Sequence, residues 1–167
     1  MQPLSSEDYG RLQAARQALG QKEYSWAKFE LDNVSAAGGA HPDVLEAAVD
    51  VHSGLNNHAK TVEVARTLID GGKAIDRGSV WLALADSLHQ LGRTEDAYET
   101  LKQFAAHDAQ GGLVHYRLAV YACLLGKSDA AKAHFTRAKS TPEGERLKRE
   151  AMGDERLREI WDFLCQP

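Results

Sequence analysis

The sequence predicts an all-α fold built from repeated pairs of helices. Two observations carry this prediction: apolar residues recur at helical spacing along the chain, and the pattern of small, apolar and turn residues repeats about every 34 positions. The composition agrees, because only four of the 167 residues are proline and runs of β-branched residues are absent. Helices of this kind cannot bury their apolar faces alone, so we expect them to stack.

The clearest unit runs from Gly78 to Gly111. Its first helix places apolar residues at i, i+3, i+4 and i+7, namely Trp81, Leu84, Ala85 and Leu88. A turn at Gly92 follows, and a second helix then carries Ala97 and Leu101. The stretch therefore predicts one helix–turn–helix unit.

The same unit recurs on both sides at nearly constant spacing. Gly92 and Gly126 are 34 residues apart, and so are the small residues Ala97 and Ala131. We expect four helix pairs in a single domain over 1–167, and we place them at 8–41, 42–77, 78–111 and 112–142. The small residue of each second helix should let its partner helix approach closely; these residues are Ala27, Thr61, Ala97 and Ala131. The glycine pairs Gly38-Gly39 and Gly71-Gly72 are expected to end second helices in left-handed conformations.

The motif W-x2-L-A-x2-L followed by A-x3-L, which begins at Trp81, resembles the tetratricopeptide repeat (TPR) family. The ending MGDERLREIWDFL is similar to that of small, single-domain bacterial TPR proteins. The resemblance implies an α-α superhelix, a TPR solenoid of about four helix pairs. Capping helices over 143–167 would cover its last layer with an apolar stripe, formed by Leu157, Ile160, Trp161 and Leu164.

The resemblance also implies a concave face, lined by the first helix of each pair, that binds a peptide. In the first pair the corresponding positions are Tyr9, Leu12, Gln13, Arg16 and Leu19. The candidate peptide-binding groove consists of Asp43, Glu46, Asp50, Leu82, Asp86, His89, Leu113, Tyr116, Arg117 and Val120. This set is acidic in its middle and apolar toward the C-terminal end, so the expected ligand is a protein or peptide carrying basic and apolar side chains. The alternative is that these acids are simply solvated on an exposed helix face.

No catalytic motif, cofactor motif or metal-binding motif is found in the sequence. The seven histidines are scattered without ligand spacing: His41, His52, His58, His89, His107, His115 and His134. Cys123 and Cys165 form no CxxC pair, and Cys123 is expected to pack rather than react. We therefore expect neither a cofactor nor a bound metal.

The net charge of −4 favours neither nucleic acid nor a membrane surface as a partner. The first ten residues, MQPLSSEDYG, do not read as a signal peptide, and a reducing, cytoplasmic location is the simplest expectation.

The function expected first is therefore a non-enzymatic protein–protein interaction module or adaptor. Two alternatives stay open. One is a self-associating structural or scaffold protein that stacks through its terminal helices around Trp161. The other is a metal-dependent enzyme that uses Asp and His residues of the groove. The partner, the oligomeric state and whether the groove is filled by the chain's own terminus are not fixed by the sequence.

Overall fold

The computed structural model describes residues 3–74, 76–106 and 111–165, and these ranges contain helices and no strands. The all-α prediction is confirmed, since neighbouring helices pack against each other in pairs. The contacts divide the chain into two compact units, Met1–Ser87 and Leu88–Pro167, which we describe separately.

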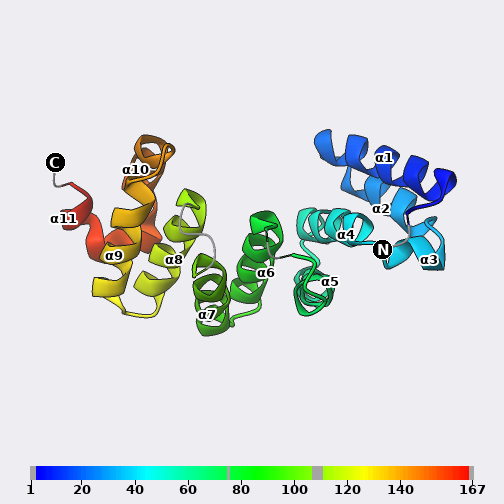
Figure 1. The fold of residues 1–167 in the computed structure, drawn as a ribbon. Helices are drawn as coiled ribbons and strands as arrows, with labels where there is room; N and C mark the ends of the chain where they lie inside the picture. The colour runs from blue at the N-terminus through cyan, green and yellow to red at the C-terminus, as the bar shows by residue number, and fades with distance from the viewer. Residues whose placement is uncertain (1–2, 75, 107–110, 166–167) are drawn as a thin grey trace. The chain divides into compact units, whose positions relative to one another are not determined.

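The N-terminal unit contains two helix pairs, a separate one-turn helix and most of a further helix. The helices are α1 (Ser6–Gly20), α2 (Tyr24–Asp32), α3 (Ala36–Gly39), α4 (Pro42–Gly54), α5 (His58–Asp70) and α6 (Gly78–Gln90), the last of which continues into the second unit. Figure 1 shows α1 and α2 side by side, and α4 packs against both of them and against α5.

The C-terminal unit is built around α8. Its elements are α7 (Thr94–Ala105), α8 (Gly112–Leu124), α9 (Ser128–Lys139), α10 (Gly144–Met152), the 3₁₀ helix η1 (Glu155–Ile160) and α11 (Trp161–Leu164). Helix α8 contacts α7, α9, α10 and η1 (Figure 1). Because it is enclosed in this way, its apolar residues are buried around most of its circumference.

One residue in the turn after the first helix of each pair has a positive φ, so the repeat is visible in the backbone conformation. Lys22, Asn56, Gly92 and Gly126 all have positive φ, with values of 60°, 55°, 78° and 69°. They follow the first helix of each pair at spacings of 34, 36 and 34 residues. Helices α4, α6 and α8 begin at Pro42, Gly78 and Gly112, where the sequence places the starts of repeats two, three and four.

The small residues of the second helices are fully buried, as the sequence predicts. Ala27, Thr61, Ala97 and Ala131 each have 0% exposure. Thr61 is the polar member of the set, and its hydroxyl donates to the backbone oxygen of Asn57 at 3.1 Å. That bond removes the cost of burying a hydroxyl without a partner.

The prediction for Gly38-Gly39 is wrong, whereas Gly72 does adopt the left-handed conformation (φ +66°) after α5. Helix α2 ends earlier, at Asp32, and Gly38 lies in the separate one-turn helix α3. Asp8 fixes this arrangement, because its carboxylate accepts bonds from the Ser35 N–H (2.8 Å) and hydroxyl (2.7 Å). A Cβ on Gly38 would lie 2.7 Å from Oδ2 of Asp8, so the close approach requires glycine.

The C-terminal segment, residues 144–164, differs from the expected pair of α-helices in its second half. Asp154 is the N-cap of this half, and its carboxylate accepts a hydrogen bond from the Arg156 N–H at 3.1 Å. The element that follows is a 3₁₀ helix, in which residues three apart lie on one face. Leu157 and Ile160 have this spacing, and both are buried.

Candidate functional site

A hollow of about 440 Å³ lies on the N-terminal unit beside α1 and the start of α4. Tyr9, Leu12 and Arg16 line it from α1, because positions i, i+3 and i+7 share one helix face. His41 and Asp43 line it from the start of α4, and Pro3, Leu4 and Ser6 complete the wall. Tyr9 is 56% exposed, whereas Leu12 forms a buried floor. Three of the five first-repeat positions that the resemblance places on the concave face therefore line this hollow.

An adjacent hollow of about 480 Å³ shares Pro3, Leu4 and His41 with the first one. Its polar centre is Asp8, whose carboxylate accepts bonds from Ser35 and from the Ser5 hydroxyl (2.9 Å). These bonds lower the pKa of Asp8, with the backbone N–H of Ser35 as the largest cause. Because its oxygens already hold the starts of α1 and α3 together, we assign Asp8 a structural role.

The acidic residues at the start of α4 are paired with an arginine. Nη2 of Arg77 donates to Oδ1 of Asp43 at 2.8 Å, and Nη1 donates to Oε2 of Glu46. The hydrogen bond from Arg77 is the main reason that the pKa of Asp43 is lowered. The predicted acidity of the groove is therefore partly neutralised, since Arg77 reaches it from the loop before α6. No local pattern in the sequence indicates this role for Arg77, because its partners lie 34 and 31 residues away.

Asp50 lies two turns further along α4 than Asp43, and its side chain is exposed. The surrounding protein reduces its hydration and raises its pKa, an effect that the charge of nearby Arg16 opposes. The positive charge of Arg16 thus acts to lower the pKa of both Asp43 and Asp50. Leu82 and Asp86, which the sequence also assigns to the groove, are half-buried on α6.

In the C-terminal unit the structure corrects the predicted groove. Tyr116 and Val120 have 4% and 0% exposure, so neither is available to a ligand in this structure. The hydroxyl of Tyr116 donates to Oδ2 of Asp154 at 2.8 Å, and η1 packs against α8. Burial, followed by the bond to Asp154, raises the pKa of Tyr116. The segment that follows α10 therefore covers part of this face of α8.

The remaining predicted groove residues of this unit are half-buried: His89, Leu113 and Arg117. Nδ1 of His89 lies 2.9 Å from the Thr94 hydroxyl, and its ring lies 5.4 Å from that of Tyr121. Both contacts of His89 are made within the C-terminal unit.

Cys123 lies on the same face of α8 as Tyr116, seven positions along. It is buried, and burial raises the pKa of its thiol to about 11. The prediction that Cys123 packs is consistent with this environment, because a protonated, enclosed thiol is a poor nucleophile.

No three His, Cys, Asp or Glu side chains within residues 3–74, 76–106 and 111–165 are grouped closely enough to hold a metal ion. His107 lies outside these ranges. Trp161, which the self-association alternative requires on the surface, is half-buried. In the part of the chain that the structure describes, no helix is both long and apolar enough to cross a bilayer.

Comparison with known proteins adds no family: no protein-family model matches the chain, and no curated protein matches it. The chain is therefore characterised by its fold, an all-α arrangement of packed helix pairs, and by the geometry of its surfaces.

Proposed function

We propose that this protein is a non-enzymatic interaction module of the TPR type, which binds a polypeptide segment on the face shared by α1 and α4. The observation that carries the proposal is the hollow of about 440 Å³ lined by Tyr9, Leu12, Arg16 and Asp43. Its volume falls in the range of about 300–1,000 Å³ that is usual for ligand sites. Its walls mix an exposed aromatic ring with charges of both signs.

The chemistry of this face favours a ligand that carries a basic residue beside an apolar one. Tyr9 and Leu12 offer apolar area for an anchoring side chain. Asp43 is paired with Arg77, which leaves Asp50 as the exposed acid further along α4. We expect a lysine or arginine of the ligand to lie toward Asp50, where it would replace part of the interaction that Arg16 makes.

The proposed location is the cytoplasm. Cys123 and Cys165 are both free thiols, one buried and one exposed. Unpaired cysteines are typical of reducing compartments.

The test is selection of short peptides from a random library, followed by calorimetric titration of a selected peptide into the full chain. We expect basic and apolar residues to be enriched. Charge reversal in Asp50→Lys should weaken binding at least about tenfold, as for truncation of a hot-spot residue. Glu145→Lys, a reversal on the exposed surface of α10, is the matched control and should leave the affinity unchanged. Equal affinity for Asp50→Lys, Tyr9→Ala and the unaltered chain would refute the proposal.

A further inference from the structure

A second surface of the N-terminal unit exposes two large aromatic side chains. Trp26 and Phe29 on α2 are 53% and 50% exposed, and they lie one helical turn apart. Their rings stack, with centroids 5.2 Å apart and an interplanar angle of 24°. Exposed tryptophan beside phenylalanine is costly in water, and such pairs are enriched at binding surfaces.

A hollow of about 150 Å³ lies directly beside Trp26. Ala14 and Ala18 of α1, four positions apart, line it with small apolar side chains, and Ala18 is buried. The remaining lining residues are polar: Gln17, Gln21 and Glu23. Because these α1 positions differ from Tyr9, Leu12 and Arg16, this hollow is separate from the one beside α4.

The polar lining favours a cation. Glu23 is exposed, is the one charged residue among the described residues that line the hollow, and forms no ion pair in the described chain. The amide oxygens of Gln17 and Gln21 can accept hydrogen bonds at its rim. The face of a tryptophan ring attracts ammonium and guanidinium groups. A carboxylate, amide oxygens and an indole around a small-residue floor thus complement an alkyl chain that ends in a positive charge.

We propose that this hollow receives the side chain of a lysine or arginine from a partner polypeptide. The alkyl stem lies on Ala14 and Ala18 against the indole of Trp26, and the charged head lies toward Glu23 and the two glutamines. Phe29 is a positioning residue, because its ring stacks on Trp26 and holds the indole beside the hollow. The proposal does not depend on the face shared by α1 and α4, because no residue lines both hollows.

The experiment follows the indole N–H of Trp26 in nitrogen–proton correlation spectra of the full chain, with the resonance assigned through Trp26→Phe. Hexalysine is the probe, and hexaglutamate and hexaproline are the comparison peptides. We expect saturable shifts of the Trp26 resonance with hexalysine alone. Glu23→Gln should weaken the apparent affinity about fivefold, which is the upper range for one exposed charge pair. Glu145→Gln, which removes the same charge from α10, should leave the affinity unchanged.

Each opposite result overturns the proposal. An unshifted indole resonance, or equal affinities for Glu23→Gln and Glu145→Gln, would show that the hollow does not recognise the cation. A larger shift with hexaproline would assign the surface to an extended proline-rich ligand. Shifts that depend on protein concentration without peptide would assign it to a second copy of the chain. Circular dichroism of each variant checks folding, and both glutamate replacements lie on the exposed surface.

Discussion

Tyr116 in α8 donates its hydroxyl to Oδ2 of Asp154, and this 2.8 Å bond joins the last helix pair to the C-terminal segment. The same carboxylate also accepts from Nε (2.8 Å) and Nη2 (2.7 Å) of Arg156. The bond links residues 38 positions apart, and it fixes η1 over the face of α8 that also carries Cys123. The accessibility of this thiol therefore reports on whether the segment is in place.

Tyr116→Phe removes the hydroxyl and keeps the ring. We expect it to destabilise the closed segment by about 1 kcal/mol, the usual contribution of one hydrogen bond. Opening should then expose Cys123 about fivefold more often. The measurement is the rate of thiol modification of Cys123 in a Cys165→Ser background, which removes the exposed cysteine. Tyr24→Phe, in the other unit, is the control, and equal rates for both variants would contradict the assignment.

Arg77 should set the charge of the proposed peptide-binding face. Arg77→Gln removes the partner of Asp43 and Glu46, so the face becomes more acidic. We expect a basic peptide to bind about fivefold more tightly, the upper range for one exposed charge pair. Calorimetric titration measures the change, with Arg66→Gln on the exposed side of α5 as the control. A weaker or unchanged affinity would place the ligand elsewhere.

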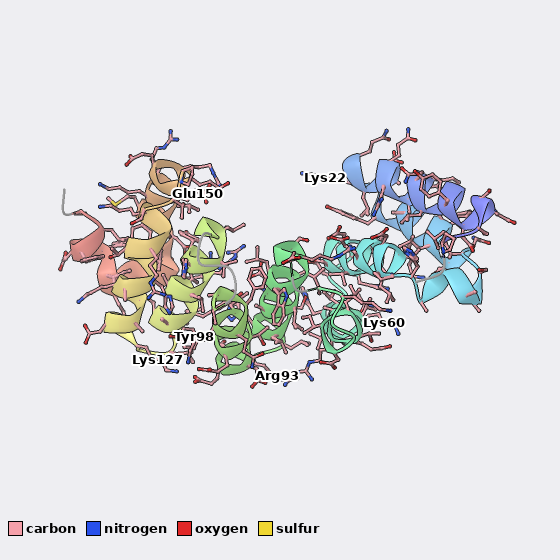
Figure 2. All side chains as sticks on the ribbon, viewed as in Figure 1. Lys22, Lys60, Arg93, Tyr98, Lys127 and Glu150 are labelled. Atoms are coloured by element: carbon pink, nitrogen blue, oxygen red, sulfur yellow. The ribbon has the colours of Figure 1, made fainter. Side chains whose placement is uncertain are left out.

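His134 should make the C-terminal unit sensitive to acid. Its Nε2 lies 3.3 Å from the Tyr98 hydroxyl, and its ring stacks on that of His115. Nζ of Lys127 lies 4.8 Å from the centroid of the Tyr98 ring, which is labelled in Figure 2, so a positive charge already lies beside the cluster. Burial lowers the pKa of His134 to about 4, and the charges of His115, Arg137 and Lys102 act in the same direction.

The sign of the pH dependence follows from this lowered pKa. Between the ordinary histidine value of 6.5 and about 4, the unfolded chain binds a proton that the folded chain does not. The contribution of neutral His134 to the free energy of unfolding is therefore fully present above pH 6.5, and it is lost as the pH decreases toward 4. We expect a loss on the order of 2 kcal/mol, allowing for partial exposure of the ring. Urea unfolding at pH 7.5 and 4.5 measures it, and His134→Gln should reduce the difference. An unchanged difference in that variant would mean that other groups cause the acid sensitivity.

Lys22 occupies the turn position that Gly92 and Gly126 occupy in later pairs, and it lies at the end of α1 (Figure 2). A residue with a Cβ is strained at its φ of 60°. Lys22→Gly should stabilise the N-terminal unit by about 0.5–1 kcal/mol, after the greater flexibility of unfolded glycine is allowed for. Gln21→Gly is the matched control, because Gln21 has φ −95° and gains nothing from glycine. Urea unfolding that ranks the two variants equally would contradict this account.

The sequence predicted the helix pairs because their signal is local and repeated. A tight turn favours glycine, as at 92 and 126, and close helix packing favours a small residue, as at Ala27, Ala97 and Ala131, so the same residue types recur with the unit. Arg77 could not be placed in the same way, because its partners Asp43 and Glu46 are 34 and 31 residues away and the contact depends on the path of a loop.

The burial of Tyr116 and Val120, which the groove prediction did not include, has a signal in the sequence. The stretch LVHYRLAVYACL in α8 is apolar around nearly its whole circumference, whereas α5 and α7 each have a polar face. A helix that is apolar on all sides is enclosed on all sides. The family pattern assigned these two residues to a groove by position alone, and their hydrophobic surroundings argued for burial.

Residues 144–160 contact both α8 and α9, the two helices on which an additional repeat would have to stack. If a helix pair were added by duplication after Lys139, its helices would have to pack on the same surface of α8 and α9 that Leu157 and Ile160 now cover. Leu157 and Ile160 would have to leave this surface before another helix pair could pack there. We therefore expect changes in the number of helix pairs to arise upstream of α8.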